Sequence, residues 1–401
     1  MTLSARAGRI AVSPTMKVAA DAMKMKAQGI DVIDFGAGEP DFPTPRHIGD
    51  AAKAAIDANF TKYTTNSGTE ELKNAVVARY REDYGVEFST SEVIITAGGK
   101  QALYNAAMVL FGPGDEVITH MPGWPTLVEQ IKLAEATPIV IHTRAEDGFN
   151  LKADAILAAV TPRTKGIIIN SPGNPTGALI TEDELATVAG EAAKRGIWIL
   201  VDLCYEKLIY DPVPHNLVKV LTSRLRDRAV ICGSASKAYA MTGWRCGWTI
   251  APKEVVAAEN ALQSHSTSNV CSITQKAVVA GLLGSQDCVS EMLNEYRRRR
   301  DQVCEWLAAE PRIRIVKPAG AFYLFPDVGE FLSPDTIRTT AELAQVMLDE
   351  ARVAITPGEA FDSPGFFRLS YATSMTDLQR GTGKILEFMR ALESRGAPAR
   401  A

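Results

Sequence analysis

Short apolar runs alternate with longer segments of helical periodicity between about residue 90 and residue 250. The run GIIIN at 166–170 is apolar at successive positions, as expected of a strand buried on both faces of a parallel sheet. We predict strands at 93–96, 116–119, 138–142, 166–170, 197–202, 229–232 and 247–251, and helices at 100–110, 124–134, 152–160, 183–195 and 252–264. The pattern therefore predicts an α/β fold with a mostly parallel, seven-stranded sheet sandwiched by helices.

The last third of the chain has a different pattern, in which long helices enclose brief strands. We predict helices at 285–309, 340–351 and 377–394, and strands at 313–316, 321–325, 353–356 and 366–370. A chain of 401 residues is long enough for two domains. We expect a large domain at 47–287 and a smaller α+β domain built from 1–46 and 288–401.

Composition and charge narrow the class of protein. The chain is 46% hydrophobic and 22% charged, with a net charge of −4, so it lacks the basic surface that nucleic acid requires. It has no run of eighteen apolar residues and no apolar signal-peptide core near its N-terminus, so we expect neither a membrane span nor secretion.

The cysteine and histidine residues bear on the cellular location and on metal binding. Six cysteines form no CxxC pair, which suits reduced thiols and a cytoplasmic location. The five histidines form no HExxH or Cys/His group, so no metal site is expected.

The only basic cluster is the run of arginines at 297–300, which follows Glu295 and precedes Asp301. Charges of opposite sign at this spacing pair along a helix surface. We interpret the cluster as a solvated helix face.

Lys237 lies in the segment SASKAYAMTGWRCG at 234–247, among small hydroxyl residues and eight positions before Arg245. A deprotonated lysine amine attacks an aldehyde to form a Schiff base, and serine hydroxyls with an arginine can hold a phosphate. Pyridoxal phosphate contains both groups. The segment follows a predicted strand, where open α/β sheets bind ligands. A solvated surface charge is the alternative for a single lysine.

Four further candidate residues lie at the ends of predicted strands or in or after turns. Asp202 ends an apolar run and can face a pyridine nitrogen, although a helix N-cap is the alternative. Asn174 lies in the turn NSPGNPTG at 170–177, and its amide and the Tyr205 hydroxyl can donate to a phenolate oxygen. Trp124 follows a Pro-Gly turn and either packs in the core or presents its face to a flat ring.

The segment AGGKQ at 97–101 joins a predicted strand to a predicted helix. Its glycines expose the amides of a helix N-terminus, which suits a phosphate, although Gly-Gly is also a common connector.

Together these residues resemble the pyridoxal-phosphate aminotransferases of the aspartate-aminotransferase superfamily, fold type I, class I, and among them the bacterial aspartate aminotransferases. The resemblance extends from about Ser13 to Arg390. It rests on the segments at 36–42, 62–63, 98–103 and 174–177, on Asp202 with Tyr205, on the Lys237 segment, and on the segments at 320–323 and 367–371.

The resemblance implies roles for individual residues around pyridoxal 5′-phosphate. Lys237 is implied as the Schiff-base lysine and proton carrier, Asp202 as the partner of the pyridinium nitrogen, and Trp124 as the residue that stacks on the ring. Asn174 and Tyr205 are implied as donors to the phenolate oxygen. The implied phosphate pocket consists of Ser234, Ser236, Arg245 and the amides of Gly99 and Lys100, together with Tyr63 of a neighbouring subunit, so a homodimer is also implied.

Arg368 resembles the arginine that binds the α-carboxylate of the substrate, with help from Gly38, Trp124 and Asn174. A planar guanidinium matches a carboxylate with two parallel hydrogen bonds, which would orient the α-hydrogen toward Lys237. A surface salt bridge is the alternative.

Substrate choice rests on fewer residues. Lys100 occupies a position at which this subgroup binds the distal carboxylate of a dicarboxylic substrate, and an exposed first-turn lysine is the alternative. Ser13 and Thr15 resemble polar residues at the entrance of the site. Ala11 stands where members that use prephenate carry a basic residue, so prephenate is not expected as a substrate.

The resemblance implies a ping-pong transamination between L-aspartate, or a similar amino acid, and 2-oxoglutarate. Two alternatives share the cofactor: an aminotransferase of broad or aromatic specificity, and a carbon-sulfur lyase that releases pyruvate and ammonia. A non-catalytic regulator would need a basic DNA-binding extension, which the sequence lacks.

Overall fold

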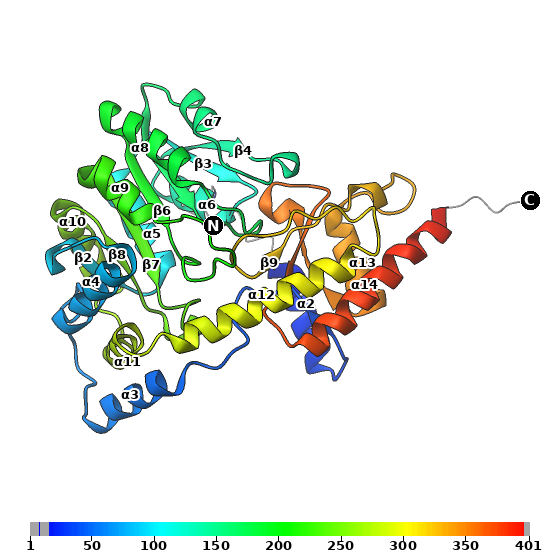
Figure 1. Cartoon of the computed structure of the whole chain (residues 1–401), viewed down its shortest axis with the longest axis horizontal. Helices are drawn as coiled ribbons and strands as arrows, with labels where there is room; N and C mark the ends of the chain where they lie inside the picture. Colours follow the sequence, from blue (N-terminus) through cyan, green and yellow to red (C-terminus); the bar gives the residue numbers. More distant parts are fainter. Residues whose placement is uncertain (1–7, 9–15, 397–401) are drawn as a thin grey trace, which may run out of the picture.

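The computed structural model describes residue 8 and residues 16–396, and side chains over residues 20–392. Its main feature is a seven-stranded sheet in the order β2-β8-β7-β6-β5-β3-β4 (Figure 1). The strands are β2 (Val93–Thr96), β3 (Glu116–Met121), β4 (Thr137–His142), β5 (Thr164–Asn170), β6 (Trp198–Asp202), β7 (Ala229–Ser234) and β8 (Gly247–Ile250). The predicted α/β fold with a mostly parallel sheet is confirmed.

One strand, β8, runs antiparallel to both of its neighbours, and the other strands of the sheet run in a common direction. The end of β7 and the end of β2 therefore meet the start of β8, where Gly247 pairs with Ser234 and with Thr96. As a result, the loops after the parallel strands and the segment that leads into β8 share one edge of the sheet.

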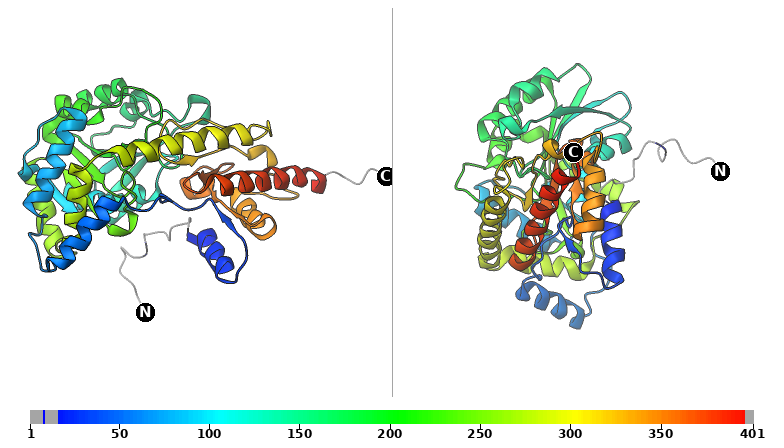
Figure 2. Two further views of the ribbon diagram at one scale, coloured as in Figure 1. Left: turned by 60° about the horizontal axis from the view of Figure 1, so that its bottom comes forward. Right: turned by 90° about the vertical axis from the view of Figure 1, so that its right-hand side faces the viewer.

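Helices cover both faces of this sheet (Figure 2). They are α4 (Glu70–Tyr84), α5 (Gly99–Leu110), α6 (Pro125–Leu133), α7 (Ala153–Ala158), α8 (Glu182–Arg195), α9 (Leu217–Leu225), α10 (Lys253–Ser264) and α11 (Ser272–Leu283). A further helix, α3 (Arg46–Asp57), packs on α11. Successive strand residues alternate between the faces: Ile168 and Leu200 pack with α5, α6 and α10, whereas Ile167 and Ile199 belong to the core with α4, α8, α9 and α11. Because both faces are covered, the central strands β5, β6 and β7 are buried and mostly apolar.

A second body of structure has its own apolar core. It contains α2 (Met16–Ala27), β1 (Ile33–Asp34), α12 (Asp287–Leu307), β9 (Tyr323–Leu324), α13 (Thr340–Ala351), β10 (Val353–Ala354), β11 (Thr356–Pro357), β12 (Phe367–Ser370) and α14 (Met375–Gly396). The N-terminal segment joins it, because β1 pairs in parallel with β10. The domain limits at 47 and 287 stay a prediction.

Two strand predictions in this part are wrong in detail. Residues 313–316 form no strand, because their only sheet-like pairing is an isolated bridge from Arg314 to Asp327. The strand predicted at 353–356 is divided into β10 and β11, which pair with different partners. Short strands depend on their neighbours for pairing, and local sequence does not identify those neighbours.

The interpretation of the arginines at 297–300 as a solvated face is wrong for all but one of them. Arg299 is 6% exposed and Arg300 is 2% exposed. Arg299 donates to Asp41 (2.7 Å) and Arg300 to Asp211 (3.1 Å), and both acids come from distant parts of the chain. Arg297 is half-buried and donates to the carbonyl of Tyr210, so only Arg298, whose side chain is 60% exposed, fits the solvated interpretation.

The cysteines are confirmed as free thiols. Over the described residues, the structure contains no helix with the length and apolar character needed to span a membrane.

Candidate active site

A cavity of about 610 Å³ opens at the sheet edge defined above, between the large sheet and the second core. Twelve residues that the sequence selected line it: Gly38, Gly99, Lys100, Trp124, Asn174, Asp202, Tyr205, Ser234, Ser236, Lys237, Arg245 and Arg368. Tyr63 is not among them and is 90% exposed. Ser13 and Thr15 lie outside the described residues.

Lys237 lies in the loop after β7 and reaches across the cavity. Its Nζ donates a hydrogen bond to the backbone carbonyl of Gly38. The same nitrogen is 5.9 Å from the ring centre of Tyr205 and 5.7 Å from that of Phe322. The amine is therefore held by one neutral acceptor between aromatic rings, in a position to react with a bound carbonyl.

Asp202 ends β6 and is 3% exposed. Its Oδ1 accepts from the amide of Cys204 (3.0 Å) and its Oδ2 from Nδ2 of Asn170 (3.1 Å). Burial raises the pKa of Asp202 to about 6, against the opposing effects of the Cys204 hydrogen bond and the Lys237 charge. A cationic nitrogen at this carboxylate would stabilise its ionised form.

Asn170 is a site residue to which the sequence analysis gave no role. Besides Asp202, it orients the loop after β5, because its Oδ1 accepts from the amide of Asn174 (3.0 Å). The backbone amide of Asn170 donates to Nε2 of His120 (3.3 Å). Burial lowers the pKa of that histidine to about 4, so its ring is a neutral acceptor. The only sequence signal for this role is its place in the turn at 170–177, and the side chain of an asparagine in a turn usually hydrogen-bonds to nearby backbone.

The start of α5 and Arg245 form a site for an anion. Gly98 precedes the helix at φ 87°, and a Cβ there would lie 2.6 Å from Nη2 of Arg245. The guanidinium also donates to the carbonyls of Thr242 (2.8 Å) and Ala97 (3.3 Å). First-turn amides such as that of Gly99 have no partner within the helix, so a cation and free N–H groups converge here.

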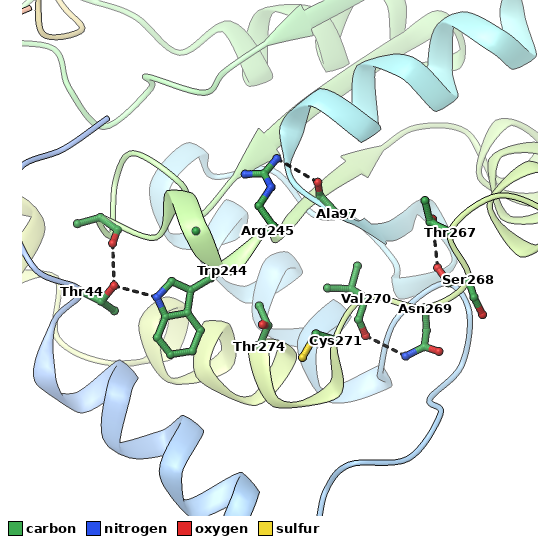
Figure 3. A pocket seen from close by; sticks show the side chains of 12 residues that line it. Thr44, Ala97, Trp244, Arg245, Thr267, Ser268, Asn269, Val270, Cys271 and Thr274 are labelled. Atoms are coloured by element: carbon green, nitrogen blue, oxygen red, sulfur yellow. Dashed lines mark hydrogen bonds between the residues drawn. The ribbon is translucent and has the colours of Figure 1, made fainter. Parts of the chain in front are cut away.

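Ser234 and Ser236 are buried beside this helix start and complete the donor set. On the outer side of Arg245 lies a second cavity of about 590 Å³, lined by Thr44, Trp244, Cys271 and neighbouring residues. Figure 3 shows Arg245 between Trp244 and Ala97 at the rim of this second cavity.

Arg368 is a buried cation in β12, with only 5% of its surface exposed. Its Nη1 donates to Oδ1 of Asn174 (3.0 Å) and its Nη2 to the carbonyl of Gly36 (2.8 Å), while its guanidinium carbon lies 4.4 Å from the ring centre of Tyr323. Its Nε has no partner. In the described part of the chain no acidic side chain lies within 4.0 Å of this guanidinium. A buried guanidinium with only neutral partners favours a carboxylate from outside the chain.

Tyr205 is held in the cavity by a second tyrosine. Its hydroxyl lies 2.8 Å from that of Tyr323, and the two rings meet edge to face at 5.8 Å. Burial raises the pKa of the Tyr205 phenol well above its ordinary value, so the hydroxyl keeps its proton and can donate it in a hydrogen bond.

Lys100 and Trp124 lie against each other, with the lysine nitrogen 4.9 Å from the centre of the indole ring. Burial lowers the pKa of Lys100, and the charge of Arg245 lowers it further. Lys100 is exposed overall, so the first-turn alternative stays open, although its side chain lines the cavity and lies against Trp124.

These groups match the parts of pyridoxal phosphate one by one. An amine faces the cavity for the aldehyde, a buried carboxylate for the ring nitrogen, and an arginine with helix amides for the phosphate. In the part of the chain that the structure describes, no three His, Cys, Asp or Glu side chains are grouped to hold a metal ion. Fold and site together indicate a pyridoxal-phosphate-dependent enzyme of fold type I.

Comparison with known proteins gives the family. The model of aminotransferase class I and II matches residues 30–385, and the chain belongs to this family. It is 40% identical to the aspartate aminotransferase of Geobacillus stearothermophilus over 98% of this chain and 100% of that one. It is 39% identical to the aspartate/prephenate aminotransferase of Cereibacter sphaeroides over 97% and 99%. The aspartate aminotransferase of Thermus thermophilus with maleate superimposes with a TM-score of 0.91 at 35% identity, covering 96% of this chain and 99% of that one.

Proposed function

We propose that the enzyme transfers the amino group of L-aspartate, or of a similar amino acid, to 2-oxoglutarate by a ping-pong mechanism. The observation that carries this proposal is Arg368, a buried guanidinium that faces the cavity of Lys237 with only neutral partners. Lys100 supplies a second cation in the same cavity. Two cations at separate points of one cavity suit a substrate with two carboxylates.

When bound, pyridoxal phosphate supplies an aldehyde that condenses with amines and a pyridinium ring that withdraws electrons. Asp202 holds the positive charge at the ring nitrogen, and Asn174 and Tyr205 donate to the phenolate oxygen. Ser234, Ser236, Arg245 and the amides of Gly99 and Lys100 hold the phosphate, and Trp124 covers the ring.

Lys237 moves the proton in this proposal. Its Nζ would take the proton from Cα of the amino acid as a general base and return it at the carbon that had carried the aldehyde oxygen. Arg368 binds the α-carboxylate with two parallel hydrogen bonds, and Asn174 and the backbone of Gly38 keep that end of the substrate in register. This arrangement directs the α-hydrogen toward Lys237.

Lys100 binds the distal carboxylate, with Ser13 and Thr15 at the entrance. The Thermus thermophilus relative with maleate supports this role, because maleate is a four-carbon dicarboxylate. The Cereibacter sphaeroides relative makes prephenate the acceptor to test next to 2-oxoglutarate.

We further propose a cytoplasmic homodimer in which Tyr63 reaches the phosphate site of the neighbouring subunit. Tyr63 is an exposed aromatic residue, and the second cavity beside Arg245 could receive one (Figure 3). Mixing Lys237→Ala subunits with Tyr63→Ala subunits should restore activity, because one site of each mixed dimer is then intact. A monomer, or a mixture that stays inactive, would argue against the shared site.

A panel of donors and acceptors tests the reaction itself. Aspartate and glutamate with 2-oxoglutarate should be the preferred pairs, ahead of aromatic amino acids and prephenate. Preference for tyrosine or phenylalanine would replace the dicarboxylate assignment with an aromatic one. Release of pyruvate and ammonia without an acceptor would identify a lyase.

A further inference from the structure

Residues 36–42, here called the strap, pass over the active-site cavity and touch two of its key side chains. The carbonyl of Gly36 accepts from Arg368 (2.8 Å), and the carbonyl of Gly38 accepts from Lys237. The orientation of both cations therefore depends on where the strap lies. Both contacts use backbone carbonyls of the strap. The position of these carbonyls therefore depends on how the other residues of the strap are held.

Two acidic side chains of the strap anchor it to neighbouring segments. Glu39 accepts from the hydroxyl of Thr242 (2.8 Å), in the loop that leads to Arg245. Asp41 accepts from Nη1 of Arg299 on α12 (2.7 Å). These anchors hold the strap from the large sheet on one side and from α12 on the other.

Arg299 is built to hold this position. Its Nε donates to Glu295 one turn earlier on α12 (2.9 Å), so the guanidinium bridges two acids. It also covers the ring of Phe42 at 5.1 Å and that of Tyr296 at 5.6 Å. Arg299 is 6% exposed, whereas 27% of the Asp41 side chain is exposed, so water and salt reach the pair from the Asp41 side only.

Aromatic packing continues from this ion pair toward the cavity. Phe42 meets Tyr296 edge to face at 5.3 Å, and Tyr296 packs on Phe322 at 5.5 Å. Phe322 in turn contacts Tyr205 and lies 5.7 Å from the amine of Lys237. Movement of Arg299 would therefore reach the site through packed rings as well as through the strap.

We propose that Arg299, through Asp41, is a positioning residue that fixes the strap so that Gly36 orients Arg368 for the substrate carboxylate. This inference rests on the role proposed above for Arg368. α12 runs from the side of α11 to that of α14 (Figures 1 and 2) and contributes Val289 to the core of the large sheet and Tyr296 to the second core. The ion pair therefore links carboxylate binding to a helix that contacts both bodies of structure.

The test uses the holoenzyme with Arg299→Gln, Arg299→Lys, Asp41→Asn and Arg368→Ala. Affinity for maleate is measured by calorimetry, and KM and kcat with aspartate are measured in parallel. Arg299→Gln and Asp41→Asn should each weaken maleate binding and raise KM by about tenfold, or about 1.4 kcal/mol, with kcat within about threefold of wild type. Arg299→Lys keeps the charge beside Asp41 and should recover part of the affinity.

Arg298→Gln is the matched control, because Arg298 is exposed on the same helix and pairs with the same Glu295. It should leave maleate affinity within about twofold of wild type. If Arg299→Gln fails to fold, Asp41→Asn decides the question, since it leaves α12 unchanged.

Two results would separate the possible failures. Wild-type affinity in both Asp41→Asn and any folded Arg299 variant, with affinity lost in Arg368→Ala, would overturn the role of Arg299 alone. Unchanged affinity in Arg368→Ala would overturn the carboxylate-binding role of Arg368 and, with it, this inference. A fall in kcat with KM and maleate affinity unchanged would also contradict positioning of Arg368.

Discussion

Buried charges are treated in opposite ways in the catalytic cavity and on the inner side of α12. Arg299 and Arg300 are buried beside acids: Arg299 contacts Asp41 and Glu295, and Arg300 contacts Asp211 and Asp301. Arg368 is buried to the same extent, yet its partners in the described chain are a side-chain amide, a carbonyl and a hydroxyl.

The difference separates charges that are compensated within the chain from a charge that is left available for a ligand. Removing a charge from water costs several kcal/mol unless an opposite charge or several hydrogen bonds compensate. On α12 the compensation comes from the chain itself and holds distant segments together. In the cavity it comes from neutral dipoles, which keep the charge in place and leave it able to bind an oppositely charged ligand.

Replacing Arg368 should have the largest effect on catalysis. Arg368→Ala should lower kcat/KM about a hundredfold or more, because the substrate carboxylate loses its paired donor. This factor corresponds to a loss of about 3 kcal/mol in transition-state stabilisation. The kcat/KM of Arg368→Lys should lie between those of wild type and Arg368→Ala, because a lysine keeps the positive charge but cannot donate two parallel hydrogen bonds. The cofactor absorption band should be retained in both, and steady-state kinetics with unchanged kcat/KM would contradict the comparison.

Asp202→Asn should change how the stability of the cofactor-free protein depends on pH. Burial raises the pKa of Asp202 from 3.8 to about 6, so the folded state resists ionisation that the unfolded chain accepts. The contribution of Asp202 to the unfolding free energy of the wild type is therefore fully present below about pH 4. As the pH rises to about 6, this contribution falls by up to about 3 kcal/mol.

The variant lacks this loss, so the difference in unfolding free energy between Asp202→Asn and wild type should grow between pH 4 and pH 6. Urea titrations at a series of pH values measure it. Asp227→Asn, at an exposed acid, is the control. A difference that stays constant across this range would show that Asp202 is not a buried acid of raised pKa.

Arg300→Met should mainly affect stability. The unfolding free energy should fall by about 2 kcal/mol, because the carbonyl of Pro318 loses its donor while the half-exposed acids Asp211 and Asp301 regain water. kcat/KM should stay within about threefold of wild type. Arg298→Met, on the exposed side of α12, should change stability by about 0.5 kcal/mol or less. A large loss of activity in folded Arg300→Met would remove the distinction between the two regions.

Lys100→Ala should give the smallest effect and the most selective one. The loss of kcat/KM should be about tenfold greater for aspartate than for alanine, because only aspartate carries a distal carboxylate. Competition assays with the two donors measure this ratio directly. Equal losses for both donors would leave Lys100 as a neighbour of Trp124 without a role in recognition.

Much of the large sheet could be predicted because its strands are apolar on both faces. Runs such as GIIIN at 166–170 carry that signal within a few residues. The sequence analysis did not assign α2, α3, α4, α9 or α11. α4 carried usable signals, since Thr69 caps its N-terminus and Gly85 ends it at φ 67°. The prediction of a strand at 313–316 was wrong because a strand needs a pairing partner from elsewhere in the chain, which local sequence does not identify.

The sequence analysis placed Lys237, Asp202 and Arg368 in one site, and all three line the cavity, while their roles stay predictions. Asn170 was not predicted as a site residue, because its role lies in hydrogen bonds to residues four and 32 positions away. The burial of Arg299 and Arg300 was missed for a similar reason. Local charge spacing is the same on an exposed and a buried helix face, and the deciding partners Asp41 and Asp211 lie 258 and 89 residues away.

The assignment of Lys237 as the amine that binds pyridoxal phosphate is tested most directly by borohydride reduction of the holoenzyme, followed by mass spectrometry of its peptides. Lys100 lines the same cavity and is the internal control. We expect the reduced cofactor on the peptide that contains Lys237. Its recovery on Lys100, or on no lysine at all, would contradict the proposed mechanism.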